Sequence, residues 1–165
     1  MSRSSGAGAI PRLSVLDRLA GGAGPREGGG DPEATLARYR QSVTRDLEWL
    51  LNTRRLPDPG PLDDFPELRT SVLSYGPPDI SSLSGDSSTT RRQLQRQMEQ
   101  LIRTFEPRLT QVRVRLEEEG AGGGRRIRFG IQASLRLGSE AERMEFDTLL
   151  ELASGRFIVK GGDHA

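Results

Sequence analysis

The fold is decided by the stretch QVRVRLEEEGAGGGRRIRFGIQASLRL at residues 111–137. Apolar and polar side chains alternate on both sides of a glycine-rich loop at residues 120–124, which is typical of β-strands with one buried face. The pattern therefore predicts an antiparallel hairpin. The side chains expected on its buried face are Val112, Val114, Leu116, Ile127, Phe129, Ile131, Ala133, Leu135 and Leu137.

Two more strands are expected downstream of the hairpin. The apolar side chains of the third are Met144, Phe146, Leu150 and Leu152. The fourth covers residues 157–159 and follows a turn at Ser154 and Gly155.

Upstream, the apolar side chains recur with a helical period over residues 32–53 and 88–105. Asp31 is expected to cap the first helix, and Asn52 to end it in the left-handed conformation. Pro107 ends the second helix. A shorter helix is predicted at residues 67–74, inside a proline-rich connector.

These elements predict an α+β fold in which two main helices pack on a small antiparallel β-meander. A length of 165 residues allows one domain, which we place at residues 31–160, with a tail at 161–165. Residues 1–30 contain eight glycines and are expected to form a flexible arm. Within the arm, PRLSVLDRL at residues 11–19 predicts a short helix that docks either on its own domain or on a partner.

Charge and composition exclude most classes of function. The chain has 24 basic and 23 acidic residues, so it has no overall field that would attract nucleic acid or a membrane surface. It has no cysteine and a single histidine, His164, so we expect no metal, no cofactor and no catalytic triad. No apolar run is long enough for a membrane span or a signal peptide, and a cytoplasmic protein is expected.

The most informative charged residue is Glu106, which stands at a helix end where the helix dipole disfavours a negative charge. Pro107 and Arg108 follow it directly. The carboxylate either pairs with Arg108 or another arginine of its own domain, or is presented with Arg108 to a partner protein. On the second interpretation, truncating Glu106 or Arg108 weakens association with the partner more than folding.

Two surfaces of the sheet are further candidates. Arginines on the solvent face of the hairpin could bind nucleic acid, but Phe129 falls on the buried face and leaves no aromatic platform, which favours a solvated or protein-binding face. The sheet also has two edges, and we expect a partner strand to add at Phe157, Ile158 and Val159, where a proline at Ile158 would block it. The arginines on the solvent face of the hairpin are Arg113, Arg115, Arg126, Arg128 and Arg136.

Four stretches together resemble the TssE family of type VI secretion baseplate subunits, relatives of the baseplate wedge protein of contractile phage tails. They are PRLSVLDRL at residues 11–19, SVTRDLEWLLNTRR at 42–55, FPELRTSVLSYGPPDI at 65–80 and IRTFEPRLTQVRV at 102–114. The resemblance covers roughly residues 11–160, and its most specific parts are DLEWLLNTR and FEPRL.

The resemblance implies a non-enzymatic structural subunit in a baseplate at the cytoplasmic face of the inner membrane. Its implied partners are other wedge subunits and the contractile sheath, whose polymerisation it helps to start by lending β-strand pairing to the first ring. It implies that Glu106, Pro107 and Arg108 contact neighbouring baseplate components. The arm residues Leu16, Asp17, Arg18 and Leu19 are further candidates for partner binding.

No nucleic acid, inserted membrane segment or small-molecule substrate is expected. A generic protein-interaction adaptor is the nearest alternative function. An RNA-binding module is another. A muramidase is the third, since the family is sometimes labelled lysozyme-like, although no pair of carboxylates is marked out for that chemistry.

Overall fold

The computed structural model describes residues 14, 17, 19, 32–55, 65–78, 88–118, 126–137, 140–151 and 154–162. Its helices are α2 (Pro32–Asn52) and α3 (Ser88–Phe105), with two short 3-10 turns between them, η2 (Pro66–Thr70) and η3 (Val72–Ser74). The strands are β1 (Leu109–Glu118), β2 (Arg126–Leu137), β3 (Glu140–Glu151) and β4 (Arg156–Gly162).

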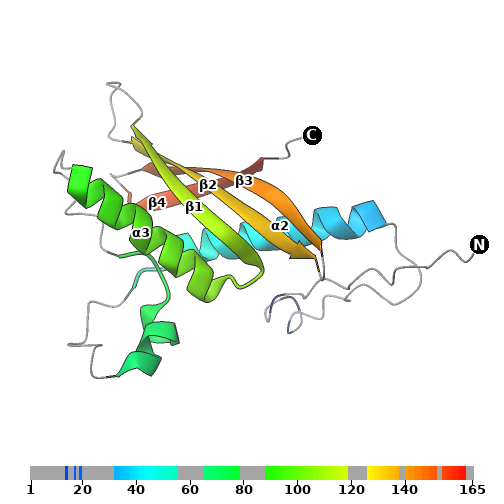
Figure 1. Ribbon diagram of the computed structural model, residues 1–165, viewed down its shortest axis with the longest axis horizontal. Helices are drawn as coiled ribbons and strands as arrows, with labels where there is room; N and C mark the ends of the chain where they lie inside the picture. The colour runs from blue at the N-terminus through cyan, green and yellow to red at the C-terminus, as the bar shows by residue number, and fades with distance from the viewer. Residues whose placement is uncertain are drawn as a thin grey trace, which may run out of the picture.

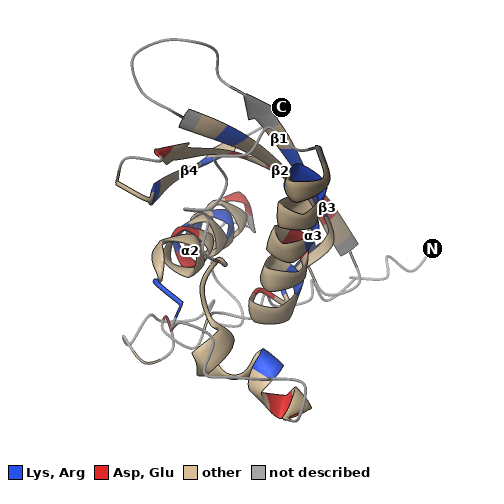
Figure 2. Ribbon diagram, turned by 90° about the vertical axis from the view of Figure 1, so that its left-hand side faces the viewer, with Lys and Arg blue, Asp and Glu red and all other residues tan. Residues whose placement is uncertain are grey.

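The described elements form two layers, a four-stranded antiparallel sheet and a pair of helices (Figure 1). Figure 2 shows α2 and α3 lying beside each other on one face of the sheet. The strands follow one another in the order β1-β2-β3-β4, so β1 and β4 are the two edges. The predicted α+β fold, with two helices on a β-meander, is confirmed.

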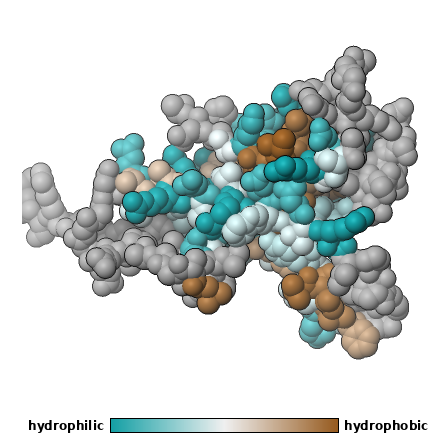
Figure 3. Space-filling view, turned by 180° about the vertical axis from the view of Figure 1, so that it is seen from behind, coloured by the Kyte–Doolittle hydropathy of each residue, from teal (hydrophilic) through white to brown (hydrophobic). Residues whose placement is uncertain are grey.

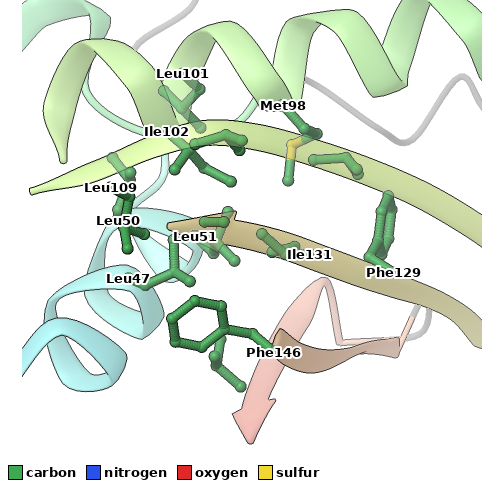
Figure 4. Close-up of a cluster of buried hydrophobic side chains, with 14 of the residues drawn as sticks. Leu47, Leu50, Leu51, Met98, Leu101, Ile102, Leu109, Phe129, Ile131 and Phe146 are labelled. Atoms are coloured by element: carbon green, nitrogen blue, oxygen red, sulfur yellow. The ribbon is translucent and has the colours of Figure 1, made fainter. Parts of the chain in front are cut away.

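The core lies between the helices and the sheet, and it is built from the two apolar patterns of the sequence. Phe129, Phe146 and Phe157 are fully buried on the sheet side. The helices contribute Leu47 and Met98 among others, and Figure 4 shows Leu47 beside Phe146 of β3 and Met98 over β1. The opposite face of the hairpin carries the exposed side chains of the alternation, as expected for a sheet with one buried face.

The ends of the predicted elements differ from the structure in a few places. Residues 67–74 form the two 3-10 turns rather than one helix. Asn52 does not adopt the expected left-handed conformation. In the described part of the chain the non-glycine residue with positive φ is instead Gln111, in a bulge of β1. β4 extends to Gly162, beyond the predicted start of the tail.

Several predictions concern residues outside the described ranges. These are Asp31, Leu152, the loop at residues 120–124, and most of the arm at residues 1–30. None of the helices in the described ranges has the length and apolar character needed to cross a membrane.

Candidate functional site

The first candidate site is the corner at Glu106, Pro107 and Arg108, between the end of α3 and the start of β1. The Glu106 and Arg108 side chains are buried, with exposed fractions of 5% and 9% for the two residues. Arg108 Nε donates to Glu106 Oε1 at 2.6 Å, and Arg108 Nη2 donates to Glu106 Oε2 at 2.5 Å. The two residues therefore form a bidentate ion pair within the domain, which is the first of the two sequence interpretations.

Arg108 also joins this corner to α2. Its Nη2 donates to Asp46 Oδ2 at 2.6 Å, and its Nη1 donates to Ser42 Oγ at 3.2 Å. The guanidinium carbon lies 5.8 Å from the centre of the Tyr39 ring. One buried arginine thus connects two carboxylates, a hydroxyl and an aromatic ring from two elements that are about sixty residues apart in the chain.

The electrostatics of this corner favour a permanent ion pair. Burial alone would lower the pKa of Arg108, but hydrogen bonds and charge attraction from Glu106 and Asp46 outweigh it and hold that pKa well above its usual range. Burial raises the pKa of the Tyr39 hydroxyl, which therefore stays neutral beside the pair. Because Arg108 occupies both oxygens of Glu106, this carboxyl group is not free to act as an acid or base.

The third member of the motif differs from the other two, since Pro107 is exposed at the tip of the corner. The buried ion pair fixes the main chain on either side of this proline. Contact between the motif and a partner stays a prediction, and Pro107 is the part of the motif that such a partner can reach.

The network continues to the arm through Asp17. Asp17 Oδ2 accepts a hydrogen bond from Ser42 Oγ at 2.5 Å, and Asp17 Oδ1 accepts one from Arg45 Nη2 at 2.7 Å. Arg45 in turn pairs with Asp46. Asp17 is therefore bound to α2 of its own chain, whereas Leu19 is 78% exposed, and Leu16 and Arg18 lie outside the described residues.

Acid should release Asp17 from α2. Burial alone would raise the pKa of Asp17. Hydrogen bonds from Ser42, Arg45 and Ser14 outweigh this effect and lower the pKa from 3.8 to about 2. A carboxyl whose folded pKa is depressed stabilises the fold above its unfolded pKa and loses that contribution as the pH falls through the folded pKa. We expect Asp17→Asn to lower the free energy of unfolding by about 1 kcal/mol near neutral pH.

This difference between the wild type and Asp17→Asn should shrink from about pH 4 towards pH 2, as denaturant unfolding at several pH values would show. A difference that is independent of pH would contradict the assigned contact. Arg54→Ala, which removes an exposed arginine just after α2, is the control for a general charge effect.

The second candidate site is the pair of sheet edges, and α3 covers the β1 edge. Val114 N–H donates to Glu99 Oε1 at 3.0 Å, and Arg103 Nη2 donates to the Val112 carbonyl at 2.7 Å. Glu99 and Arg103 also pair with each other, at 3.4 Å. Two side chains of one helix thus occupy an N–H and a carbonyl on the outward side of β1, which protects this edge at Val112 and Val114 from pairing with another chain.

The β4 edge is occupied at one position only among the described residues. Phe157 N–H donates to Asn52 Oδ1 at 2.9 Å, and Asn52 Nδ2 donates to the Phe157 carbonyl at 2.9 Å. Main-chain groups alternate in direction along a strand, so those of Val159 and Gly161 also face outward. Within the described ranges, no hydrogen bond joins these outward groups to another residue.

This alternation changes the role expected for Ile158. Its N–H and carbonyl face β3, opposite Leu149, so a proline at Ile158 would break the sheet itself and would not test strand addition. The side chains of Phe157 and Val159 are buried in the core, and Ile158 is the one exposed on the outer face, at 40%. Whether these three residues bind a partner stays a prediction.

The solvent face of the sheet carries both signs of charge. Arg113 and Arg115 are exposed on β1, and Glu145 and Asp147 lie on the same face from β3. Arg128 Nε lies 3.4 Å from Asp147 Oδ1. The arginines therefore do not form a continuous basic surface of the kind that nucleic-acid binding needs.

Sequence reasoning missed a projecting apolar surface on η2 and η3. Val72 is 82% exposed, and Phe65 and Leu73 are exposed beside it. Figure 3 shows hydrophobic surface on this projection. The Tyr75 ring packs edge-on against Phe105 at 5.2 Å, which anchors the segment next to Glu106. Large apolar residues inside a proline-rich connector were the available signal.

Gly76 explains how this segment approaches α2. Its φ is +116°, and a Cβ at this position would lie 2.3 Å from the carbonyl oxygen of Thr53. Only glycine therefore fits where the segment passes the end of α2.

The residues in the described ranges contain no group of three or more histidine, aspartate and glutamate side chains placed to bind a metal ion. The family model described as baseplate wedge protein gp25 matches residues 37–140, which is more than half of the chain and includes the Glu106–Arg108 pair. Comparison with curated proteins gives no match.

Proposed function

The chain belongs to the baseplate wedge protein gp25 family, and on that premise we propose that it is the TssE-type wedge subunit of a type VI secretion system. Members of the gp25 family are structural proteins of contractile tail-like systems and are not enzymes. The partners of such a protein are other wedge components and the sheath. We further propose its place in the cell and the surfaces through which it contacts its partners.

The type VI assignment is supported by the two most specific stretches, DLEWLLNTR and FEPRL. The first contributes Asp46 to the buried network and Asn52 to the β4 edge. The second contributes the Glu106–Arg108 pair. Both stretches therefore contribute side-chain contacts to the two candidate sites.

The observation that carries the sheath-initiating role is the pair of outward-facing residues on β4, Val159 and Gly161, whose main-chain groups have no hydrogen-bond partner in the described ranges. Glu99 and Arg103 already occupy one carbonyl and one N–H of the β1 edge, at Val112 and Val114, while Val159 and Gly161 present outward main-chain groups on β4. An extended segment of a sheath subunit would supply the missing donors and acceptors as a fifth strand. In this proposal the wedge lies at the cytoplasmic face of the inner membrane, with the sheath extending from it.

The wedge partners would contact the end of the molecule that carries Pro107, Val72 and Leu73. This surface is apolar at its tip and is fixed from behind by the buried ion pair and by Tyr75. Residues 1–30, which we propose form an arm held on α2 by Asp17, would contribute Leu19 and its neighbours to the same assembly.

The test of the proposed function is co-purification of the tagged chain with the wedge proteins of the type VI cluster in its own genome. We expect a stable complex that a Val72→Asp and Leu73→Asp double variant weakens by at least about tenfold, because a charge cannot be buried in an apolar contact without a large cost. Thr70→Asp, at an exposed site on the same projection, is the control. Failure of the wild-type chain to bind any wedge protein would contradict the proposal.

A further inference from the structure

Asn52 makes an unusual set of contacts for the last residue of a helix. One hydrogen bond of its Nδ2 goes back to the Glu48 carbonyl at 2.9 Å, as in an ordinary helix end. Its Nδ2 and Oδ1 also engage the Phe157 carbonyl and N–H, which lie 105 residues away, at 2.9 Å each. The carboxamide therefore bonds to its own helix through Nδ2 and to β4 through both Nδ2 and Oδ1.

The contact with Phe157 reproduces what a neighbouring strand provides. In an antiparallel ladder, each outward residue exchanges one N–H and one carbonyl bond with the residue opposite it. The Asn52 side chain supplies the same acceptor and donor from one carboxamide. It occupies the first outward position of β4, while the main-chain groups of the next two outward positions, Val159 and Gly161, have no hydrogen-bond partner in the described ranges.

We infer that Asn52 is a one-residue strand mimic that sets the register of the segment added to β4. This inference rests on the proposed function, because it specifies where a sheath strand pairs. The incoming strand bonds to Val159 and Gly161 and stops before Phe157, where Asn52 already fills the place of its next residue.

The outer face of β4 indicates which side chains the incoming strand should carry. Ile158 and Lys160 are exposed there, and side chains opposite each other on one face of a sheet interact. An apolar residue beside Ile158 and an acidic residue beside Lys160 would suit this register. A shift by one residue would move both to the wrong face.

The test uses amide hydrogen exchange on the full chain, alone and with the purified sheath subunits of the same genome. In the chain alone, Asn52→Ala should speed exchange of the Phe157 amide by about tenfold, because its acceptor is lost. The Ile158 and Lys160 amides, which bond to β3, should be unchanged. Asn52→Asp is the matched control, since it keeps the acceptor for the Phe157 N–H and should keep the amide protected.

With the sheath subunits present, the Phe157 amide of Asn52→Ala should become protected again, because the added strand extends by one position. Binding should tighten about fivefold through the additional main-chain pairing. If the sheath subunits bind Asn52→Ala but its Phe157 amide still exchanges fast, the register role is overturned while strand addition is not. Absence of binding by both the wild type and the variant would overturn strand addition, and the register role with it.

Discussion

Arg108→Ala is expected to lower the free energy of unfolding by about 3–5 kcal/mol, because it leaves the buried Glu106 carboxylate without its cation and leaves Asp46 with Arg45 alone. Glu106 loses both of its bidentate bonds and Asp46 loses its partner from the α3–β1 corner. A domain of this size has a total stability of only about 5–15 kcal/mol, so the variant should unfold at a much lower denaturant concentration. Urea unfolding followed by circular dichroism measures this.

Arg113→Ala is the matched control, since it removes an exposed arginine from the adjacent strand and should change stability by no more than about 0.5 kcal/mol. A second variant removes every charge of the corner at once, with Asp46→Asn, Glu106→Gln and Arg108→Met. It should be more stable than Arg108→Ala, because no buried charge is left unpaired. Equal stability of Arg108→Ala and Arg113→Ala would contradict the structural role of the pair.

The charge-free variant also separates folding from partner binding. The sequence suggested that truncating Glu106 or Arg108 weakens association more than folding, but the burial of both residues makes a folding defect the larger expected effect. If the charge-free variant folds and still joins the wedge, the pair acts inside the domain only. If it folds and fails to join, the charges themselves reach a partner.

Val159→Pro is expected to prevent sheath initiation, because it removes an outward main-chain donor from the β4 edge. The loss should be nearly complete, since the described part of β4 offers an added strand two outward residues to bond, Val159 and Gly161. The measurement is sheath nucleation on reconstituted baseplates, counted by electron microscopy. Incorporation of the variant into the wedge should be unaffected.

Val114→Pro is the matched control on the other edge. It is the same substitution at a buried valine whose N–H also faces outward, but this N–H is bonded to Glu99 within the chain. It should cost about 1 kcal/mol of stability and leave nucleation intact. The opposite result, nucleation lost with Val114→Pro and kept with Val159→Pro, would place strand addition at the β1 edge.

The layers of this fold could be predicted from the sequence because each rests on a local pattern. The alternation in residues 111–137 predicts strands, and the helical spacing of apolar side chains predicts α2 and α3. Pro32 marks the start of α2 and Pro107 follows the end of α3, so both of these helix ends were predicted within a residue. These signals act over a few positions, so no knowledge of distant contacts is needed.

The details of both sites could not be predicted, because they depend on contacts between distant segments. Ser42 and Asp46 are four residues apart on α2, and their polar side chains lie next to an apolar stripe, but nothing local shows that Arg108 meets them. Asn52 carries an ordinary signal for a helix end, and its engagement of Phe157 depends on how α2 lies against β4. The direction of each main-chain group in β4 likewise depends on how β4 pairs with β3.

If the β4 edge receives a strand from the sheath, amide exchange of the wild-type chain should report it at the two outward residues of that strand. The exchange rates of Val159 and Gly161 are measured in the wedge, before and after sheath subunits assemble on it. Both amides should exchange fast before assembly and be strongly protected afterwards, with Ile158 protected throughout by its bond to β3. Sheath assembly that leaves Val159 and Gly161 exchanging as fast as before would contradict strand addition at this edge.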